Sequence, residues 1–153
     1  MPLEIERKFL VDSTEYKLGA KAIEITQAYL AVEKNLAVRV RIEGVRASIT
    51  IKSKKSERVN LEYEYSIPLD EAKSMMILSP FPAIEKTRHT LEHEGHTWEV
   101  DEFYGENKGL VVAEIELDEE NEQFEKPHWL GEEVTGDFRY LNSNLAKMPI
   151  QKW

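Results

Sequence analysis

Apolar and polar residues alternate along the first strand-like stretch of the chain, from Leu3 to Val11. Because successive side chains of a β-strand point to opposite faces, one face is apolar apart from Arg7, and the other carries Glu4, Glu6 and Lys8. In isolation this pattern is typical of a half-solvated strand of an antiparallel sheet. Almost every later strand repeats it, with ionisable residues at every second position, and this repetition calls for a common explanation.

The same alternation predicts seven further strands, and breaks in it predict short helices. We expect strands over 23–32, 38–42, 46–52, 59–67, 84–89, 97–103 and 110–117. Helices are expected over 12–18, 68–78, 118–125 and 144–147, and residues 133–140 read as an irregular or short extended piece. Eight strands, mostly joined as hairpins, predict a mainly β (α+β) fold: an antiparallel sheet that closes or nearly closes into a barrel.

Either face of such a barrel can be the inner one. With the apolar faces inside, the charged residues form a solvated exterior, but the helices then have no apolar sheet surface to cover. With the charged faces inside, helices cover an apolar outer wall and the lumen is a polar tunnel. We favour the second arrangement. Because buried charges need compensation, it implies a ligand that brings counter-charge.

The amino-acid composition of the chain argues against several classes of protein. The chain has 153 residues, which is within the range of one domain spanning 1–153. It has no cysteine, which excludes disulfides and thiolate metal sites, and no apolar run near the roughly 20 residues of a membrane span. We therefore expect a soluble, cytoplasmic protein without a membrane partner. A net charge of −9 argues against a general nucleic-acid binder, because phosphate backbones require a broad basic surface.

The inward charges suit a complex of polyphosphate and metal. Pairs of arginine and lysine at spacing two present converging donors to several phosphoryl groups. Pairs of carboxylates on other strands supply the hard oxygen ligands that Mg²⁺ or Mn²⁺ prefers. Their joint occurrence over many strands is the argument, since each pair alone is a weak signal.

These residues also resemble a known family. Glu4-Ile5-Glu6-Arg7-Lys8 looks like the ExExK signature that opens the CYTH superfamily, the triphosphate tunnel metalloenzymes. The likeness continues in order along the chain, through QAYL (27–30), VRVR (38–41), TIK (50–52), LEYE (61–64), EKTR (85–88), WEVDEF (98–103) and AEIE (113–116). The resemblance implies an eight-stranded antiparallel tunnel with short helices packed outside, acting on triphosphates with Mg²⁺ or Mn²⁺.

The resemblance also implies roles for individual residues. Lys8 is expected to orient or activate the attacking water with help from Tyr29. Phosphate binding falls to the basic residues Arg39, Arg41, Lys52, Lys86 and Arg88. Metal binding falls to the carboxylates Glu4, Glu6, Glu114 and Glu116. Glu62, Glu64 and Asp101 either complete a second metal site or pair with the basic residues.

The family includes several activities, and the compact chain favours one of them. We expect a small prokaryotic-type inorganic triphosphatase that hydrolyses tripolyphosphate to pyrophosphate and phosphate, with a homodimer as one candidate assembly. The alternatives are a class IV adenylyl cyclase, a thiamine or nucleoside triphosphatase, and a non-catalytic polyphosphate-binding module. The retained carboxylates argue against the last, because binding a polyanion requires only basic residues.

Overall fold

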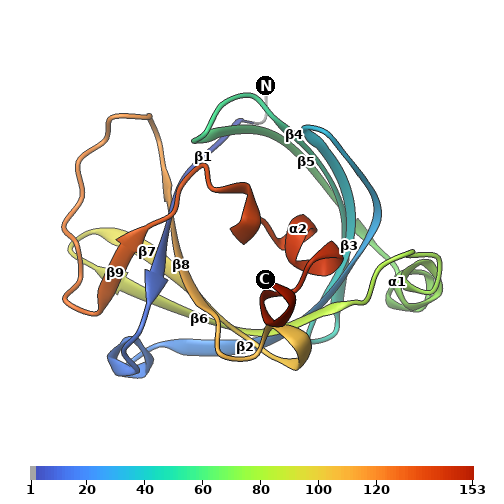
Figure 1. Ribbon diagram of the computed structural model, residues 1–153, viewed down its shortest axis with the longest axis horizontal. Coiled ribbons are helices and arrows are strands. Elements are labelled where there is room, and N and C mark those ends of the chain that lie inside the picture. Colours follow the sequence, from blue (N-terminus) through green and yellow to red (C-terminus); the bar gives the residue numbers. More distant parts are fainter. Residues whose placement is uncertain (1–2) are drawn as a thin grey trace.

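The computed structural model describes residues 3–153, which form a closed antiparallel β-barrel with short helices (Figure 1). The barrel strands are β1 (Leu3–Val11), β2 (Lys21–Glu33), β3 (Leu36–Glu43), β4 (Arg46–Lys54), β5 (Val59–Ile67), β6 (Ile84–His93), β7 (His96–Phe103) and β8 (Val111–Leu117). They follow the order β5-β4-β3-β2-β6-β7-β8-β1, and a pairing of β1 with β5 closes the ring. The expected eight-stranded barrel is therefore confirmed.

The polar faces of the strands point into the barrel, as expected. On β1, Glu4, Glu6 and Lys8 line the internal cavity, whereas Phe9, one residue further on, packs with Trp98 in the core outside the wall. This core covers β1, β7 and β8 and is completed by Tyr16 from the 3₁₀ turn η1 (Glu15–Lys17) and by Trp129. Most of the hydrophobic core thus lies around the tunnel rather than within it.

Helix α1 (Leu69–Met76) covers another part of the outer wall (Figure 1). Its buried Ala72 packs against Val40 of β3 and Ala47 of β4, so the small side chain lets the helix lie close to the sheet. The helix is amphipathic, and Pro68 precedes its first turn. Within residues 3–153, no helix is long and apolar enough to cross a membrane.

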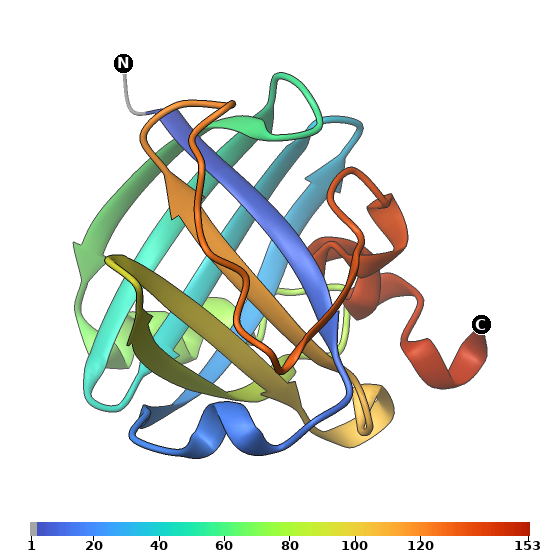
Figure 2. The same ribbon diagram turned by 90° about the vertical axis from the view of Figure 1, so that its left-hand side faces the viewer.

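The C-terminal segment departs from the expectation that every helix packs outside. Figures 1 and 2 show η3 (Phe138–Tyr140), α2 (Asn142–Lys147) and η4 (Ile150–Lys152) over one end of the barrel. Leu145 and Ala146 of α2 are buried against the inward-facing Tyr29 and Phe103. The expectation was wrong for α2 because the inward positions at this end are apolar and need an apolar cover.

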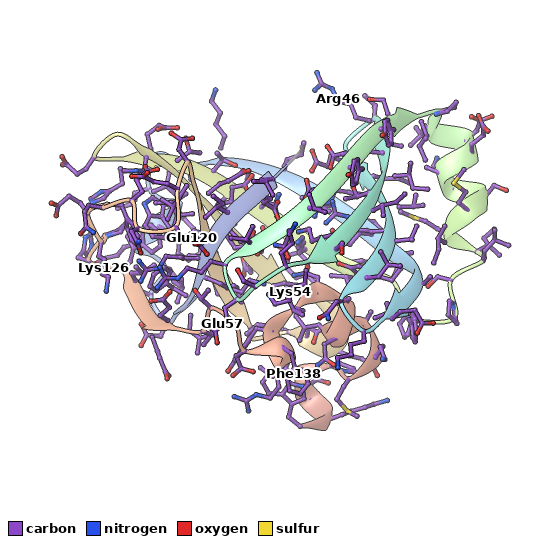
Figure 3. All side chains as sticks on the ribbon, turned by 90° about the horizontal axis from the view of Figure 1, so that it is seen from above. Arg46, Lys54, Glu57, Glu120, Lys126 and Phe138 are labelled. Atoms are coloured by element: carbon purple, nitrogen blue, oxygen red, sulfur yellow. The ribbon has the colours of Figure 1, made fainter. Side chains whose placement is uncertain are left out.

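Residues 118–125 do not form the expected helix. The segment runs as turns and irregular chain over the outer wall, and Figure 3 labels Glu120 and Lys126 on it. Phe124 packs edge-on against Phe9 and Trp98, with ring centroids 6.2 Å and 5.7 Å away. The Glu122 carboxylate accepts a hydrogen bond from the Asp118 backbone N–H at 2.7 Å. These contacts override a helical propensity that is weak in a segment this short.

A short ninth strand, β9 (Leu130–Glu133), pairs with the end of β1 across a register shift between Phe9 and Val11. A β-carbon on Gly131 would lie 2.6 Å from the Leu10 carbonyl oxygen, so only glycine allows this approach. On the same strand, Glu133 accepts two hydrogen bonds from the Arg7 guanidinium, at 2.8 Å and 2.5 Å. The hydrogen bond from Arg7 holds the pKa of Glu133 down, at about 2, and burial opposes it only partly.

The pairing of Arg7 with Glu133 predicts a pH-dependent loss of stability in Glu133→Gln. The depressed pKa of Glu133 stabilises the fold above the ordinary glutamate pKa of about 4.3, and this contribution is lost as the pH falls toward 2. At pH 7 we expect the free energy of unfolding to fall by about 1 kcal/mol, a value limited by partial solvent exposure. Urea denaturation measures it, with the exposed neighbour variant Glu132→Gln as control. An unfolding difference that stays constant between pH 7 and pH 3 would contradict the assignment.

Candidate active site

The barrel encloses a cavity of about 320 Å³ that is lined mainly by ionisable side chains. Every residue that the sequence predicted for the site lines this cavity except Asp101. The strands from which these residues come divide them into two groups on different sides of the cavity. Carboxylates of β1 and β8 form an acidic wall, and cations of β3, β4 and β6 form a basic wall. We use the terms acidic wall and basic wall for these two sets.

The acidic wall consists of Glu4, Glu6, Glu114 and Glu116. Glu6 and Glu116 occupy directly opposite positions of β1 and β8, an arrangement of like charges that is unfavourable without a cation. Burial, together with the neighbouring charge of Glu114, raises the pKa of Glu6 to about 8. Among residues 3–153, neither Glu6 nor Glu116 forms a hydrogen bond or an ion pair with a side chain. Glu4 and Glu114 of this wall do pair with cations, Lys52 and Lys8, so the uncompensated part of the wall is Glu6 and Glu116.

The basic wall consists of Arg39, Arg41, Lys52, Lys86 and Arg88. Burial, together with the charges of Arg39 and Arg88, lowers the pKa of Arg41 to about 10. Such mutual repulsion between partly desolvated cations is relieved by an anion with several negative oxygens. Lys52 differs from the others, because it donates to Glu4 at 2.9 Å across the β1–β5 closure. Burial alone would lower the pKa of Lys52, but Glu6 and Glu4 raise it above its ordinary value.

Asp101 lies behind the basic wall rather than in the cavity. Its carboxylate oxygens accept hydrogen bonds from Arg88 at 2.9 Å and 3.0 Å, and one of them lies 2.7 Å from Lys86 Nζ. Although burial opposes it, the charges of Lys86 and Arg88 hold the pKa of Asp101 far below its usual range. Of the two roles that the sequence left open for Asp101, this geometry favours pairing with the basic residues.

Glu62 and Glu64 of β5 also face cations. Glu62 lies 3.3 Å from Lys52 Nζ, and Glu64 lies 3.6 Å from an Arg39 nitrogen. Thr50 connects Arg39 to Glu64, since its hydroxyl accepts from Arg39 at 3.0 Å and donates to Glu64 at 3.1 Å. The two glutamates therefore orient basic side chains at the β4–β5 side of the cavity.

Lys8 and Tyr29 both reach the cavity from different strands. The Lys8 ammonium lies 3.5 Å from a Glu114 oxygen and donates to the Tyr140 carbonyl oxygen at 3.4 Å. The Tyr29 hydroxyl accepts a hydrogen bond from Gln27 at 3.4 Å, and its ring packs in the apolar cluster beneath α2. Tyr29 therefore combines packing with access to the lumen.

Comparison with known proteins agrees with this geometry. Residues 2–147 match the family model described as the CYTH domain. The chain belongs to the CYTH domain family.

Proteins named inorganic triphosphatase are similar to this CYTH domain. One from Acetivibrio thermocellus is 49% identical over 154 residues, covering 100% of this chain and 99% of the relative. Another, from Nitrosomonas europaea, is 34% identical over 147 residues, covering 94% and 96%. The crystal structure of the inorganic triphosphatase NE1496 matches with a TM-score of 0.66 at 33% identity, covering 93% of this chain and 96% of that one.

The carboxylates of this CYTH domain suit a divalent cation whose remaining coordination positions are filled by oxygens of the substrate. Among residues 3–153, no three His, Asp or Glu side chains are already grouped to hold a metal ion. The acidic wall nevertheless presents two opposed carboxyl groups, Glu6 and Glu116, that pair with no side chain among residues 3–153, and a bound cation would favour their ionised forms. Mg²⁺ is usually bound through only one or two carboxylates together with phosphate oxygens and water. The arrangement therefore suits an ion that arrives with a phosphate ligand.

Sequence reasoning missed several residues that line the cavity of the CYTH domain. Thr50 and Glu99 share the inward parity of Lys52 and Asp101, so strict use of the alternation would have found both. Gln27 does not itself line the cavity, but it belongs to a recognised motif and its amide oxygen accepts a hydrogen bond from Arg41 at 2.9 Å. Asn142 comes from the C-terminal helix, where no local pattern marks it.

The pairing of Asp101 predicts that Asp101→Asn strongly destabilises the protein. The change leaves the buried Arg88 guanidinium without its counter-ion, and arginine cannot discharge by losing a proton. We expect a loss of about 3 kcal/mol in the free energy of unfolding, measured by chemical denaturation at pH 7. The matched control is Glu99→Gln, because Glu99 also contacts Arg88, at 3.4 Å, but is 39% exposed. Equal stability of the two variants would show that the buried pair is not needed.

Proposed function

We propose that this CYTH domain hydrolyses inorganic tripolyphosphate to pyrophosphate and phosphate in the presence of Mg²⁺ or Mn²⁺. The observation that carries the proposal is the division of one enclosed cavity into an acidic and a basic wall. A polyanion alone would satisfy only the basic wall, and a cation alone would satisfy only the acidic one. The two relatives named inorganic triphosphatase support the choice of substrate.

Each wall has its own part in the reaction. The acidic wall, through Glu4, Glu6, Glu114 and Glu116, would hold the cation, which when bound neutralises phosphate oxygens and polarises the phosphoryl group under attack. The basic wall would hold the three phosphoryl groups and stabilise the charge that develops on the leaving pyrophosphate. Asp101, Glu62 and Glu64 keep the basic side chains in place without entering the reaction.

Lys8 and Tyr29 are the candidates for handling the attacking water. Lys8 Nζ is held between Glu114 and the Tyr140 carbonyl and still faces the cavity. From there it can donate to the water oxygen or to the phosphoryl group and fix their relative position. The water oxygen forms the new bond to phosphorus while the bond to the pyrophosphate oxygen breaks, and the proton that the water loses passes to a phosphate oxygen of the products.

The first test is metal-dependent turnover and its loss in Glu6→Gln. This variant keeps the shape of the side chain but removes an anionic ligand. We expect phosphate release from tripolyphosphate to require added Mg²⁺ or Mn²⁺ and to fall at least 100-fold in Glu6→Gln, with an unchanged melting curve. The control is Glu120→Gln on the outer loop (Figure 3). Parallel assays with ATP, thiamine triphosphate and pyrophosphate, with detection of cyclic AMP, distinguish the alternatives. Full activity in excess chelator would refute the metal requirement.

The second test compares two arginines of the same hairpin. Arg41 is buried in the basic wall, whereas Arg46 is exposed and lies outside the cavity (Figure 3). Removing a charge-assisted contact to phosphate in Arg41→Ala should lower kcat/KM by about 10- to 100-fold. Arg46→Ala should leave kcat/KM within about twofold of the parent. Steady-state kinetics with tripolyphosphate measure both, and the same small effect for both variants would remove Arg41 from the binding site.

A further inference from the structure

A continuous chain of side-chain hydrogen bonds connects the basic wall to the C-terminal segment. Gln27 accepts from Arg41 Nε at 2.9 Å and donates to Asn142 Oδ1 at 3.0 Å. Asn142 Oδ1 also accepts from Lys86 Nζ at 2.8 Å. One amide oxygen of α2 thus joins two phosphate-binding residues on different strands. Nothing in the strand patterns or in the family resemblance assigns Asn142 a role.

The donor-only side chains of Arg41 and Lys86 determine how the amides of Gln27 and Asn142 are oriented. Arg41 and Lys86 can only donate hydrogen bonds, so each requires an oxygen as its partner. The Gln27 amide must therefore turn its oxygen to Arg41 and its nitrogen to Asn142. The Asn142 amide must turn its oxygen to Gln27 and Lys86. This leaves the Asn142 Nδ2 group as the one amide end with no partner in the chain of bonds.

The free Nδ2 group lies where the substrate would be. Asn142 lines the cavity, and its Nδ2 group forms no hydrogen bond with any of residues 3–153. It is not among the buried, unpaired polar atoms either, so it keeps some exposure, and the cavity is the space that Asn142 is known to line. Two neutral N–H bonds beside Lys86 are suited to a phosphoryl oxygen, because they add donors without adding to the repulsion among the cations.

We propose that Asn142 is a substrate-binding residue whose Nδ2 group donates to an oxygen of the phosphoryl group nearest the capped end of the tunnel. Its oxygen meanwhile holds Lys86 and Gln27 in position. This inference rests on the proposed function, since it assumes that a polyphosphate occupies the cavity. It makes the cap a part of the binding site as well as a cover for the barrel.

Two substitutions separate direct binding from a purely structural role. Asn142→Asp keeps an oxygen that accepts from Lys86 and Gln27, but it replaces the free donor with a second carboxylate oxygen. Asn142→Ala removes both functions. If Asn142 acts only by holding Lys86 and Gln27, the Asp variant should be impaired only through the repulsion between its added negative charge and the polyanion. Because salt screens such repulsion, the Asp variant should then match the parent at high salt, and only the Ala variant should be impaired there. If Nδ2 contacts phosphate, the Asp variant should be at least as impaired as the Ala variant at high salt as well.

The experiment measures steady-state kinetics with tripolyphosphate for the parent and three variants. We expect kcat/KM to fall about 10- to 100-fold in Asn142→Ala and at least as far in Asn142→Asp, with unchanged melting of the Asp variant. The matched control is Asn144→Ala, because Asn144 lies on the same helix and its amide donates to the Arg139 carbonyl instead. Parent-like kinetics of Asn142→Asp at high salt would overturn the inference.

A binding measurement tests the Asn142 contact independently of the proposed hydrolysis. Calorimetric titration with tripolyphosphate in excess EDTA reports affinity without metal-dependent turnover. Weaker binding by Asn142→Asp at high salt, with parent-like binding by Asn144→Ala, supports the contact even if the parent protein releases no phosphate. Turnover by the parent with equal affinity of the parent and both Asn142 variants would refute the contact and leave the proposed function intact.

Discussion

Charges that face one another inside a closed barrel must be compensated within a small space, and this requirement shapes the rest of the molecule. Strand alternation sends ionisable side chains inward, and the pairing of β1 with β5 prevents the sheet from opening to solvate them. Part of the compensation is internal, as in the hydrogen-bonded set of Asp101, Lys86 and Arg88. The remainder is not supplied by the protein, since Glu6 and Glu116 face each other and, within residues 3–153, neither pairs with a basic side chain. This incomplete internal compensation is the physical basis of the proposal that a metal and a polyanion bind together in the barrel.

Much of the barrel and of the site was predictable because both depend on the period of two along a strand. The parity of Glu4, Glu6 and Lys8 on β1 was enough to place them inside, once an apolar outer wall was required for the helices. The predictions that failed concern segments whose structure depends on contacts between residues distant in the sequence. The expected helix over 118–125 was wrong because Phe124 packs against Phe9 and Trp98, which are distant in sequence. A local pattern does not contain such contacts.

The position of α2 was missed for a related reason, although the chain does contain a signal. Inward positions at one end of several strands are apolar, and they share the parity of the lumen charges. These residues are Leu10, Tyr29, Ile84, Phe103 and Val112. An apolar residue at an inward position predicts that something covers it. Read along β8, the change from Glu116 and Glu114 to Val112 marks the point where the polar lumen ends and the cap begins.

The cap is therefore part of the site rather than an appendage to the barrel. Its apolar residues, Leu145 and Ala146, fasten it to the inward-facing apolar ring, and this burial stabilises its position. The same docking brings the Tyr140 carbonyl within reach of Lys8 and the Asn142 amide within reach of Lys86. Because the apolar contacts and the polar contacts come from one short segment, the barrel end cannot be closed without also fixing these two lysines. The orientation of Lys86 in the basic wall thus depends on the burial of apolar side chains at the capped end of the barrel.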